Sequence, residues 1–264
     1  MDTSEEGRRV ERKTDRALTL EQLRWAGIRE GSRVLDLGCA AGTTCRMMAG
    51  LVGDTGRVVG VDASAGRVAE GQAHADHRST TEYRQGDAAR IPAADGEFDV
   101  SWSRFLFEYL PRPEAALAEM IRVTKPGGTV CVSDLDGNCI WHHPCDPHLR
   151  AEIDDALRTL GDGFNPRIGL SLYTMFIDAG LHDVAVDIRP YHVVAGEIDV
   201  KHAENWRMKF EGVSAALRAR GWAAARTHAL QSTLMSHLLS HRTLTYSILF
   251  SVRGKARHGA DDVV

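Results

Sequence analysis

Residues 34–44 read VLDLGCAAGTT. Three apolar residues and Asp36 form the pattern of a short buried strand, which runs through a loop of small residues into a helix beginning near Thr43. The two loop glycines, Gly38 and Gly42, are separated by three residues, so the loop lacks the Gly-x-Gly of the dinucleotide fingerprint. An acid just before the first glycine suits a ligand that carries cationic groups better than a pyrophosphate.

Composition excludes several classes of protein. The chain has 264 residues, 43% hydrophobic and 26% charged, which is typical of a soluble globular protein with a sizeable core. The formal net charge of -4 argues against a protein that binds nucleic acid. The first twenty residues are polar, without the apolar segment of a signal peptide, and no apolar run could span a membrane, so we expect a cytoplasmic protein. Five cysteines without a Cys-x-x-Cys pair indicate neither a zinc ribbon nor a redox motif.

Strand and helix patterns alternate through the first half of the chain. This alternation predicts parallel βαβ units, whose ligands bind beyond the carboxyl ends of the strands. Asp36, Asp62, Asp87 and the segment 103–105 each end or follow a predicted strand, so we expect them around one crevice. The predicted strands are 33–38, 57–62, 81–88, 97–104 and 128–136, and the predicted helices are 43–51, 64–76 and 112–124.

The second half completes the predicted fold. Helices are expected at 146–161 and 166–180, strands at 182–194 and 243–254, and a mainly helical insertion at 200–241. The fold class is therefore α/β: a Rossmann-like, mostly parallel seven-stranded sheet with helices on both faces and a helical insertion before the last strand. The predicted organisation is an N-terminal helical segment (1–30), a core (31–198), an insertion or lid for the acceptor (199–241), a terminal strand (242–255) and a disordered tail (256–264).

Five stretches of the sequence carry a resemblance to a known family. They are VLDLGCAAGTT, VVGVDAS, GDAARIP, FDVSWSRFLFEYLPRPEAALAEMIRVTKPGG and PRIGLSLYTMFIDAGLHDVAV, in this order along the chain. Together they resemble class I S-adenosylmethionine-dependent methyltransferases, in particular the branch that methylates quinone rings in quinone biosynthesis (UbiE-like). The resemblance implies S-adenosylmethionine as cofactor and methyl transfer as the reaction. The family usually has glycine where this chain has Ala40, and we expect the backbone to adjust slightly.

The resemblance also assigns cofactor contacts. Asp36 would lie near the methionyl ammonium, partly through water, Asp62 would accept both ribose hydroxyls, and Asp87 would accept the adenine amino group beside the backbone of Ala88. The alternatives are plain turn or helix-capping roles for the three acids and a surface salt bridge for Arg104. The full predicted cofactor set is Asp36, Gly38, Cys39, Ala40, Gly42, Asp62, Ala63, Gly86, Asp87, Ala88, Ser103, Arg104 and Phe105.

The acceptor side is less defined. A loop is expected at 137–147, after the fifth strand, and its His142 and His143 are candidate catalytic bases, as is Tyr109 after the fourth strand. Ordinary loop hydrogen bonding is the alternative for both histidines, and two adjacent histidines without a spaced partner do not indicate a metal. We expect about two-thirds of the apolar residues of the insertion to be core, and the rest, with Trp141 and Phe105, to line an apolar acceptor pocket.

These features predict a methyltransferase that acts on a hydrophobic small molecule, such as a secondary metabolite, with O-, N- and C-methylation all open. A cyclase or other non-methylating catalyst on the same fold, or a regulatory module that binds the cofactor, are the alternatives. We expect neither a nucleic-acid nor a membrane partner, and the sequence leaves open whether the chain forms a homo-oligomer.

Overall fold

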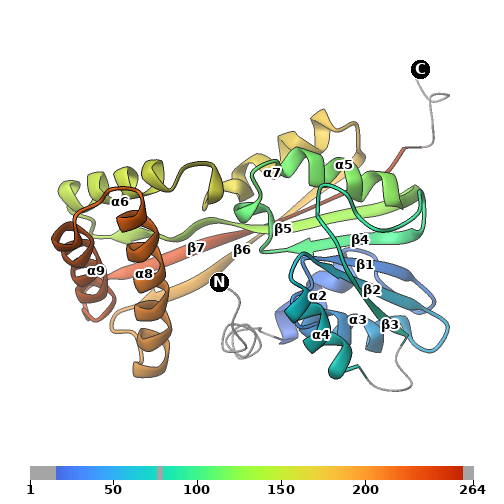
Figure 1. The fold of residues 1–264 in the computed structure, drawn as a ribbon, viewed down its shortest axis with the longest axis horizontal. Helices are drawn as coiled ribbons and strands as arrows, with labels where there is room; N and C mark the ends of the chain where they lie inside the picture. Colours follow the sequence, from blue (N-terminus) through green and yellow to red (C-terminus); the bar gives the residue numbers. More distant parts are fainter. Residues whose placement is uncertain (1–15, 76–79, 258–264) are drawn as a thin grey trace.

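The computed structural model describes residues 16–75 and 80–257 (Figure 1). Parts of the predicted N-terminal segment (1–15) and tail (258–264) lie outside the described residues. The strands form one sheet in the order β3-β2-β1-β4-β5-β7-β6, in which the first five are parallel and β7 runs antiparallel to both neighbours. This arrangement confirms the predicted fold class. The strands are β1 (Arg33–Leu37), β2 (Arg57–Asp62), β3 (Thr81–Gln85), β4 (Phe98–Arg104), β5 (Thr124–His143), β6 (His182–Ala195) and β7 (Leu244–Lys255).

Helices cover both faces of the parallel part of the sheet (Figure 1). On one face, α2, α3 and α4 pack over a cluster that includes Met48 and Trp102, and on the other, α5 and α7 pack over one that includes Val132 and Phe176. A strand buried on both faces needs apolar residues at successive positions, which is why these strands read as short apolar runs. The helices on these two faces are α2 (Arg16–Trp25), α3 (Thr43–Val52), α4 (Ala65–Ala73), α5 (Pro113–Val123) and α7 (Ile168–Asp178).

A helical cap lies beyond the carboxyl end of the parallel strands. Strand β5 pairs with β4 as far as Ser133 and then continues, with β7 and β6 alongside, into the helices α6 (Pro147–Leu160), α8 (Val200–Ala219) and α9 (Ala224–Leu238) (Figure 1). The cap has a hydrophobic core of its own, in which Leu238 is fully buried. Among the described residues, no helix is long and apolar enough to cross a membrane.

Several of the expected boundaries were wrong. β3 ends at Gln85, where the third strand was expected to reach 88, and β5 begins at Thr124, where the fifth was expected to begin at 128. The residues after position 136 were expected to form a loop, but β5 extends to His143, because Trp141, His142 and His143 pair with Tyr246, Thr245 and Leu244 of β7. The pairing resumes after a register shift between Asp136 and Trp141. At the other end, Ala256 is 2% exposed and exchanges backbone hydrogen bonds with Gly127 and Gly128, so the ordered core extends into the predicted tail.

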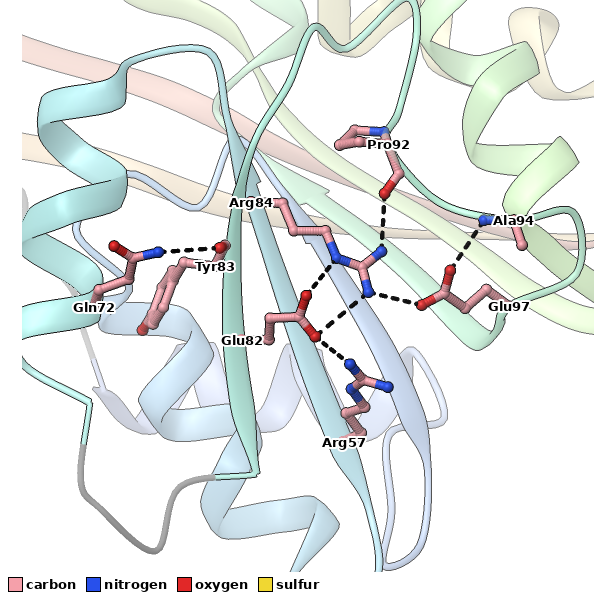
Figure 2. A network of polar contacts seen from close by, with 8 residues as sticks. All are labelled: Arg57, Gln72, Glu82, Tyr83, Arg84, Pro92, Ala94 and Glu97. Atoms are coloured by element: carbon pink, nitrogen blue, oxygen red, sulfur yellow. Dashed lines mark hydrogen bonds and ion pairs between the residues drawn. The ribbon is translucent and has the colours of Figure 1, made fainter.

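Charged side chains hold the loop between β3 and β4 in place (Figure 2). Arg84 donates to Glu82 at 2.7 Å, to Glu97 at 3.1 Å and to the carbonyl of Pro92 at 2.9 Å, and Glu82 also contacts Arg57 of β2. Exposed ion pairs of this kind contribute little stability one by one, and a network contributes more. The network fixes the far end of the loop that carries Gly86, Asp87 and Ala88.

Candidate cofactor and acceptor site

The loop between β1 and α3 requires glycine at positions where a side chain would not fit. Gly42 has φ 80°, in the left-handed region that favours glycine, and a Cβ there would lie 2.0 Å from the hydroxyl oxygen of Tyr83. The amide of Gly38 donates to the carbonyl of Val61 at 2.7 Å, which ties the start of the loop to β2. The loop therefore passes close to the carboxyl ends of both β1 and β2.

Ala40, where the resembling family has glycine, also has a left-handed backbone, with φ 48°. This conformation costs an alanine about 1–2 kcal/mol. Its amide donates to Oδ2 of Asp62 at 2.9 Å, and this bond to a carboxylate offsets part of that cost. Ala40 thus adopts the backbone conformation that glycine would adopt at this position. Its hydrogen bond to Asp62 fixes the loop relative to the end of β2.

Asp62 ends β2 and turns its carboxylate toward the glycine loop. Besides Ala40, it accepts from the amide of Ser64 at 3.0 Å. The N-cap of α4 is Ser64, whose hydroxyl accepts from the amide of Arg67 at 3.3 Å, so the alternative that Asp62 caps this helix is wrong. Each carboxylate oxygen accepts one backbone bond and keeps capacity for a second, as two ribose hydroxyls would require.

Asp36 lies beneath the loop, 3% exposed. The pKa of its carboxyl group is raised from 3.8 to about 7, chiefly by burial and also by the charge of Asp62. The thiol of Cys45, which donates to Oδ2 at 3.2 Å, and the charge of Arg104 lower this pKa. Since the charge of Asp62 raises the pKa of Asp36, a cationic ligand near both carboxyl groups would favour the ionised form of Asp36. Because Asp36 is so deeply buried, its charge would act on a ligand ammonium through an intervening group.

The side chains of Ser103 and Arg104, at the end of β4, connect this strand to neighbouring elements. The hydroxyl of Ser103 is buried and donates to the carbonyl of Leu37 at 3.0 Å, so this side chain ties β4 to β1. Arg104 donates to the hydroxyl of Thr19 in α2 at 2.9 Å, and its guanidinium lies 4.5 Å from the ring centre of Phe105. These contacts show that the side chain of Arg104 joins α2 and β4.

The segment after β3 carries the remaining predicted residues. Asp87 is exposed and accepts from the amide of Ala89 at 2.9 Å, which is the turn role named as its alternative; its second oxygen is available to a ligand. A Cβ on Gly86 would lie 2.4 Å from Pro92, so the turn is tight. On the β2 side, Ala63 is exposed and its carbonyl accepts from Gln85 at 3.2 Å, while Cys39 is 6% exposed within the glycine loop.

Comparison with known proteins identifies this part of the chain. Residues 35–132 match the family described as a methyltransferase domain. They form a class I methyltransferase domain. The predicted family and its cofactor, S-adenosylmethionine, are thereby confirmed. The donor set fits that cofactor, because the carboxylate of Asp62 lies beside the glycine loop and the loop offers no phosphate cradle.

Relatives with sequence similarity to this methyltransferase domain act on different acceptors. A demethylmenaquinone methyltransferase of Beutenbergia cavernae is 41% identical over 120 residues, 46% of each chain. An arsenite methyltransferase of Aquipseudomonas alcaligenes is 37% identical over 40% of this chain and 33% of its own. A ubiquinone/menaquinone biosynthesis C-methyltransferase of Ectopseudomonas mendocina is 29% identical over 67% of this chain and 73% of its own. The chain thus spans less than half the length of the first two.

Solved structures share the fold at low identity. The YcgJ protein of Bacillus subtilis superposes with a TM-score of 0.60 at 19% identity, covering 92% of this chain and 100% of its own. The [4+2]-cyclase SpnF superposes with a TM-score of 0.55 at 20% identity, covering 92% of this chain and 81% of its own. One fold therefore serves different chemistries.

The predicted catalytic residues come from two elements: His142 and His143 end β5, and Tyr109 ends the short helix at 107–109. His142 is 6% exposed in β5, where its Nδ1 lies 2.8 Å from the hydroxyl of Thr245 and its ring meets His237 edge-on at 4.6 Å. His143 follows at the exposed end of β5. Tyr109 is 51% exposed beside Phe164, with ring centres 5.5 Å apart. Their catalytic roles remain predictions.

Two buried acids, Asp134 and Glu108, lie next to one another where β5 leaves β4. Asp134 is fully buried, and its carboxylate accepts from the amides of Glu108 at 3.1 Å and Leu135 at 2.8 Å. Burial, and then the charge of Glu108, raise the pKa of Asp134 well above its usual range. Asp134 thereby holds the short helix η1 (Phe107–Tyr109) against β5. Among the described residues, no three metal-binding side chains come together.

The apolar residues of the insertion are mostly cap core, as about two-thirds were expected to be. They pack against Ile140, Ile198 and the inner face of α6, and Met208, 49% exposed, is the exception among those predicted. Tyr191 and His192 of β6, which contact Phe105 and the cap, were not predicted, because nothing in the sequence distinguishes them from other strand residues. The insertion residues in the cap core are Trp206, Phe210, Leu217, Trp222, Leu230, Leu234, Met235 and Leu238.

Proposed function

We propose that this protein is an S-adenosylmethionine-dependent methyltransferase that acts on a hydrophobic small molecule of the quinone or secondary-metabolite kind. The observation that carries the proposal is the carboxylate of Asp62, which ends β2 and is held against the glycine loop by Ala40. The core binds the cofactor, and the cap and the edge of the domain that faces it receive the acceptor.

The chain's own contribution is chiefly binding and orientation. Bound S-adenosylmethionine supplies a methyl group already activated for displacement. Asp62 orients the ribose through its two oxygens, and Asp87 accepts from the adenine amino group. Asp36, whose pKa is about 7, becomes ionised when the cationic ammonium binds near it. Holding the acceptor atom about 3 Å away in line, with water excluded, then accounts for most of the acceleration.

Proton removal depends on the acceptor. An amine or an electron-rich carbon attacks without a base, whereas a phenol or alcohol gains from one. Asp134 is fully buried and its carboxyl group accepts from two backbone amides, so it is not placed to reach an acceptor. His142, His143 and Tyr109 remain the candidates, and His143 is the more exposed of the two histidines.

A ring-bearing acceptor is favoured over arsenite. Trivalent arsenic is bound by accessible thiols. Of the described cysteines, Cys39, Cys45 and Cys131 are buried and Cys145 is partly buried, so none offers an open thiol cluster. The relatives named for demethylmenaquinone and for ubiquinone/menaquinone C-methylation point instead to a quinone-type ring.

Mass spectrometry of S-adenosylhomocysteine tests this proposal. We expect its release when the purified chain is incubated with S-adenosylmethionine and reduced naphthoquinones that carry a free ring position. The Asp62→Ala variant is the comparison, and we expect it to release less S-adenosylhomocysteine when the cofactor is limiting. Tight cofactor binding without S-adenosylhomocysteine release, across amine, phenol and quinol acceptors, would instead indicate a non-methylating catalyst or a cofactor-binding regulatory module.

A further inference from the structure

A row of aromatic side chains runs from the end of β4 into the cap. The ring centres of Phe105 and Tyr191 lie 5.4 Å apart, those of Tyr191 and His192 lie 4.3 Å apart, and those of His192 and Trp206 lie 5.3 Å apart. Trp206 continues to Phe210 at 5.8 Å. Such spacings are those of favourable aromatic contacts. The row joins the cofactor edge of the domain to the cap.

The backbone is unusual at two points of this row. Phe105 has φ 56° and His192 has φ 48°, in the left-handed region where bulky residues are uncommon. The amide of Phe105 donates to the carbonyl of Ser133 at 3.0 Å, which holds the turn after β4. Unfavourable backbone conformations that persist are concentrated at functional sites.

The row lies where the strand pairing is irregular, near the cap. The pairing of β6 with β7 shifts register between Tyr191 and Val194, and that of β5 with β7 shifts between Asp136 and Trp141. A bulge of this kind redirects side chains and is frequent beside active sites. Here it allows the adjacent residues Tyr191 and His192 to contact one another and to reach, respectively, Phe105 and Trp206.

Burial differs along the row. Trp206 and Phe210 are 5% and 8% exposed and belong to the cap core, whereas Phe105, Tyr191 and His192 are only partly buried. The guanidinium of Arg104 also lies over the ring of Phe105. The three partly buried rings, tilted by 47° and 59° from one to the next, therefore form an aromatic wall between the cap and the predicted cofactor residues.

We propose that Tyr191 and His192 are specificity-determining residues that select a flat aromatic acceptor. An aromatic wall stacks on a planar ring system, and a saturated ring of the same size makes poorer contact with it. This inference rests on the proposed function, because that function places the methyl group of the cofactor beside the wall. The quantity that it concerns is the affinity for the acceptor ring. It assigns to β6 the role that the sequence pattern suggested for the cap helices.

Equilibrium binding to the full chain tests the inference. The probe is 2,3-dimethyl-1,4-naphthoquinone, which is planar and has both reactive ring positions blocked, and the comparison ligand is the saturated 2-decalone. Both are titrated calorimetrically with and without S-adenosylhomocysteine. We expect the wild type to prefer the naphthoquinone, and Tyr191→Leu to weaken it about three- to tenfold, with little change for 2-decalone.

Three further measurements make the result decisive. Tyr173→Leu removes a tyrosine that is 48% exposed on α7, and we expect it to bind both probes as the wild type does. Tyr191→Phe keeps the aromatic ring, and we expect this variant to prefer the naphthoquinone over 2-decalone as the wild type does. Affinity for S-adenosylhomocysteine should stay within twofold in all three variants.

Equal affinity of the wild type for the two probes, or an unchanged preference in Tyr191→Leu, would overturn the inference. An equal loss for both probes in Tyr191→Leu would also overturn it, since that would show general damage to the cap. Failure of the wild type to bind S-adenosylhomocysteine, with the naphthoquinone preference intact, would refute the proposed function and leave the aromatic wall in place.

Discussion

Replacement of Asp62 by alanine is expected to damage both cofactor affinity and the glycine loop. The carboxylate accepts from the amides of Ala40 at 2.9 Å and Ser64 at 3.0 Å. Both amides lose their acceptor in the variant, and each such bond contributes about 1 kcal/mol net. We therefore expect the free energy of unfolding to fall by about 2 kcal/mol.

The loss of cofactor affinity should be larger than this structural effect alone explains. Two charge-assisted bonds to the ribose hydroxyls contribute about 1.5–3 kcal/mol together. The dissociation constant of S-adenosylmethionine should therefore rise roughly ten- to a hundredfold, because about 1.4 kcal/mol corresponds to a factor of ten. Asp62→Asn keeps one carbonyl oxygen as acceptor and should show a smaller effect on both quantities.

Titration calorimetry and urea denaturation separate the two effects. Asp54→Ala is the matched control, because it removes an exposed carboxylate from the turn after α3. We expect this control to match the wild type in both measurements. A folded Asp62→Ala protein that lost stability but bound S-adenosylmethionine within twofold of the wild type would show that Asp62 only braces the loop, which would refute its assignment to the ribose.

Three further outcomes follow from buried groups. Because burial raises the pKa of Asp36 from 3.8 to about 7, the folded protein holds a proton there that the unfolded chain releases, so stability should fall as pH rises from about 4 to 7. Asp36→Asn should remove this fall. Between pH 4 and pH 8, urea titrations should show that the free energy of unfolding of the wild type falls by up to about 4 kcal/mol more than that of the variant. The same pH dependence in both proteins would contradict this prediction. If His142 is a base, His142→Ala should lower kcat with little change in cofactor affinity, whereas full turnover in both His142→Ala and His143→Ala would exclude a histidine base. Leu238→Ala, in the cap core, should lower the free energy of unfolding by about 2–5 kcal/mol in urea titrations, with cofactor affinity retained, and a parallel loss of affinity would place the cap in the cofactor site.

The sequence predicted the parallel half of the fold closely. The expected strand at 57–62 coincides with β2, because a short apolar run followed by an acid has no other good conformation between two helices. The expected fifth strand stopped at 136, since Gly137 and Asn138 read as a turn. The chain continues as β5 because β7, more than a hundred residues later, supplies a partner for Trp141–His143. Such long-range pairing leaves no local signal.

The candidate site was predictable only where one segment carries it. Asp36, Gly38 and Gly42 lie in one strand–loop–helix unit, so their proximity followed from the pattern of residues 34–44. The partners of these residues come from elsewhere, such as Tyr83 above Gly42 and Cys45 beside Asp36. The aromatic wall depends on a register shift in β6, which cannot be predicted from the residue types there.

Amide hydrogen exchange with and without S-adenosylmethionine tests the position of the cofactor site most directly. We expect the bound cofactor to slow exchange severalfold in residues 38–42, 62–64, 86–89 and 103–106, which follow β1, β2, β3 and β4. The cap helices α8 and α9 should change little. Protection confined to the cap, or absent from residues 38–42 and 62–64 at saturating cofactor, would contradict the assignment of this crevice to S-adenosylmethionine.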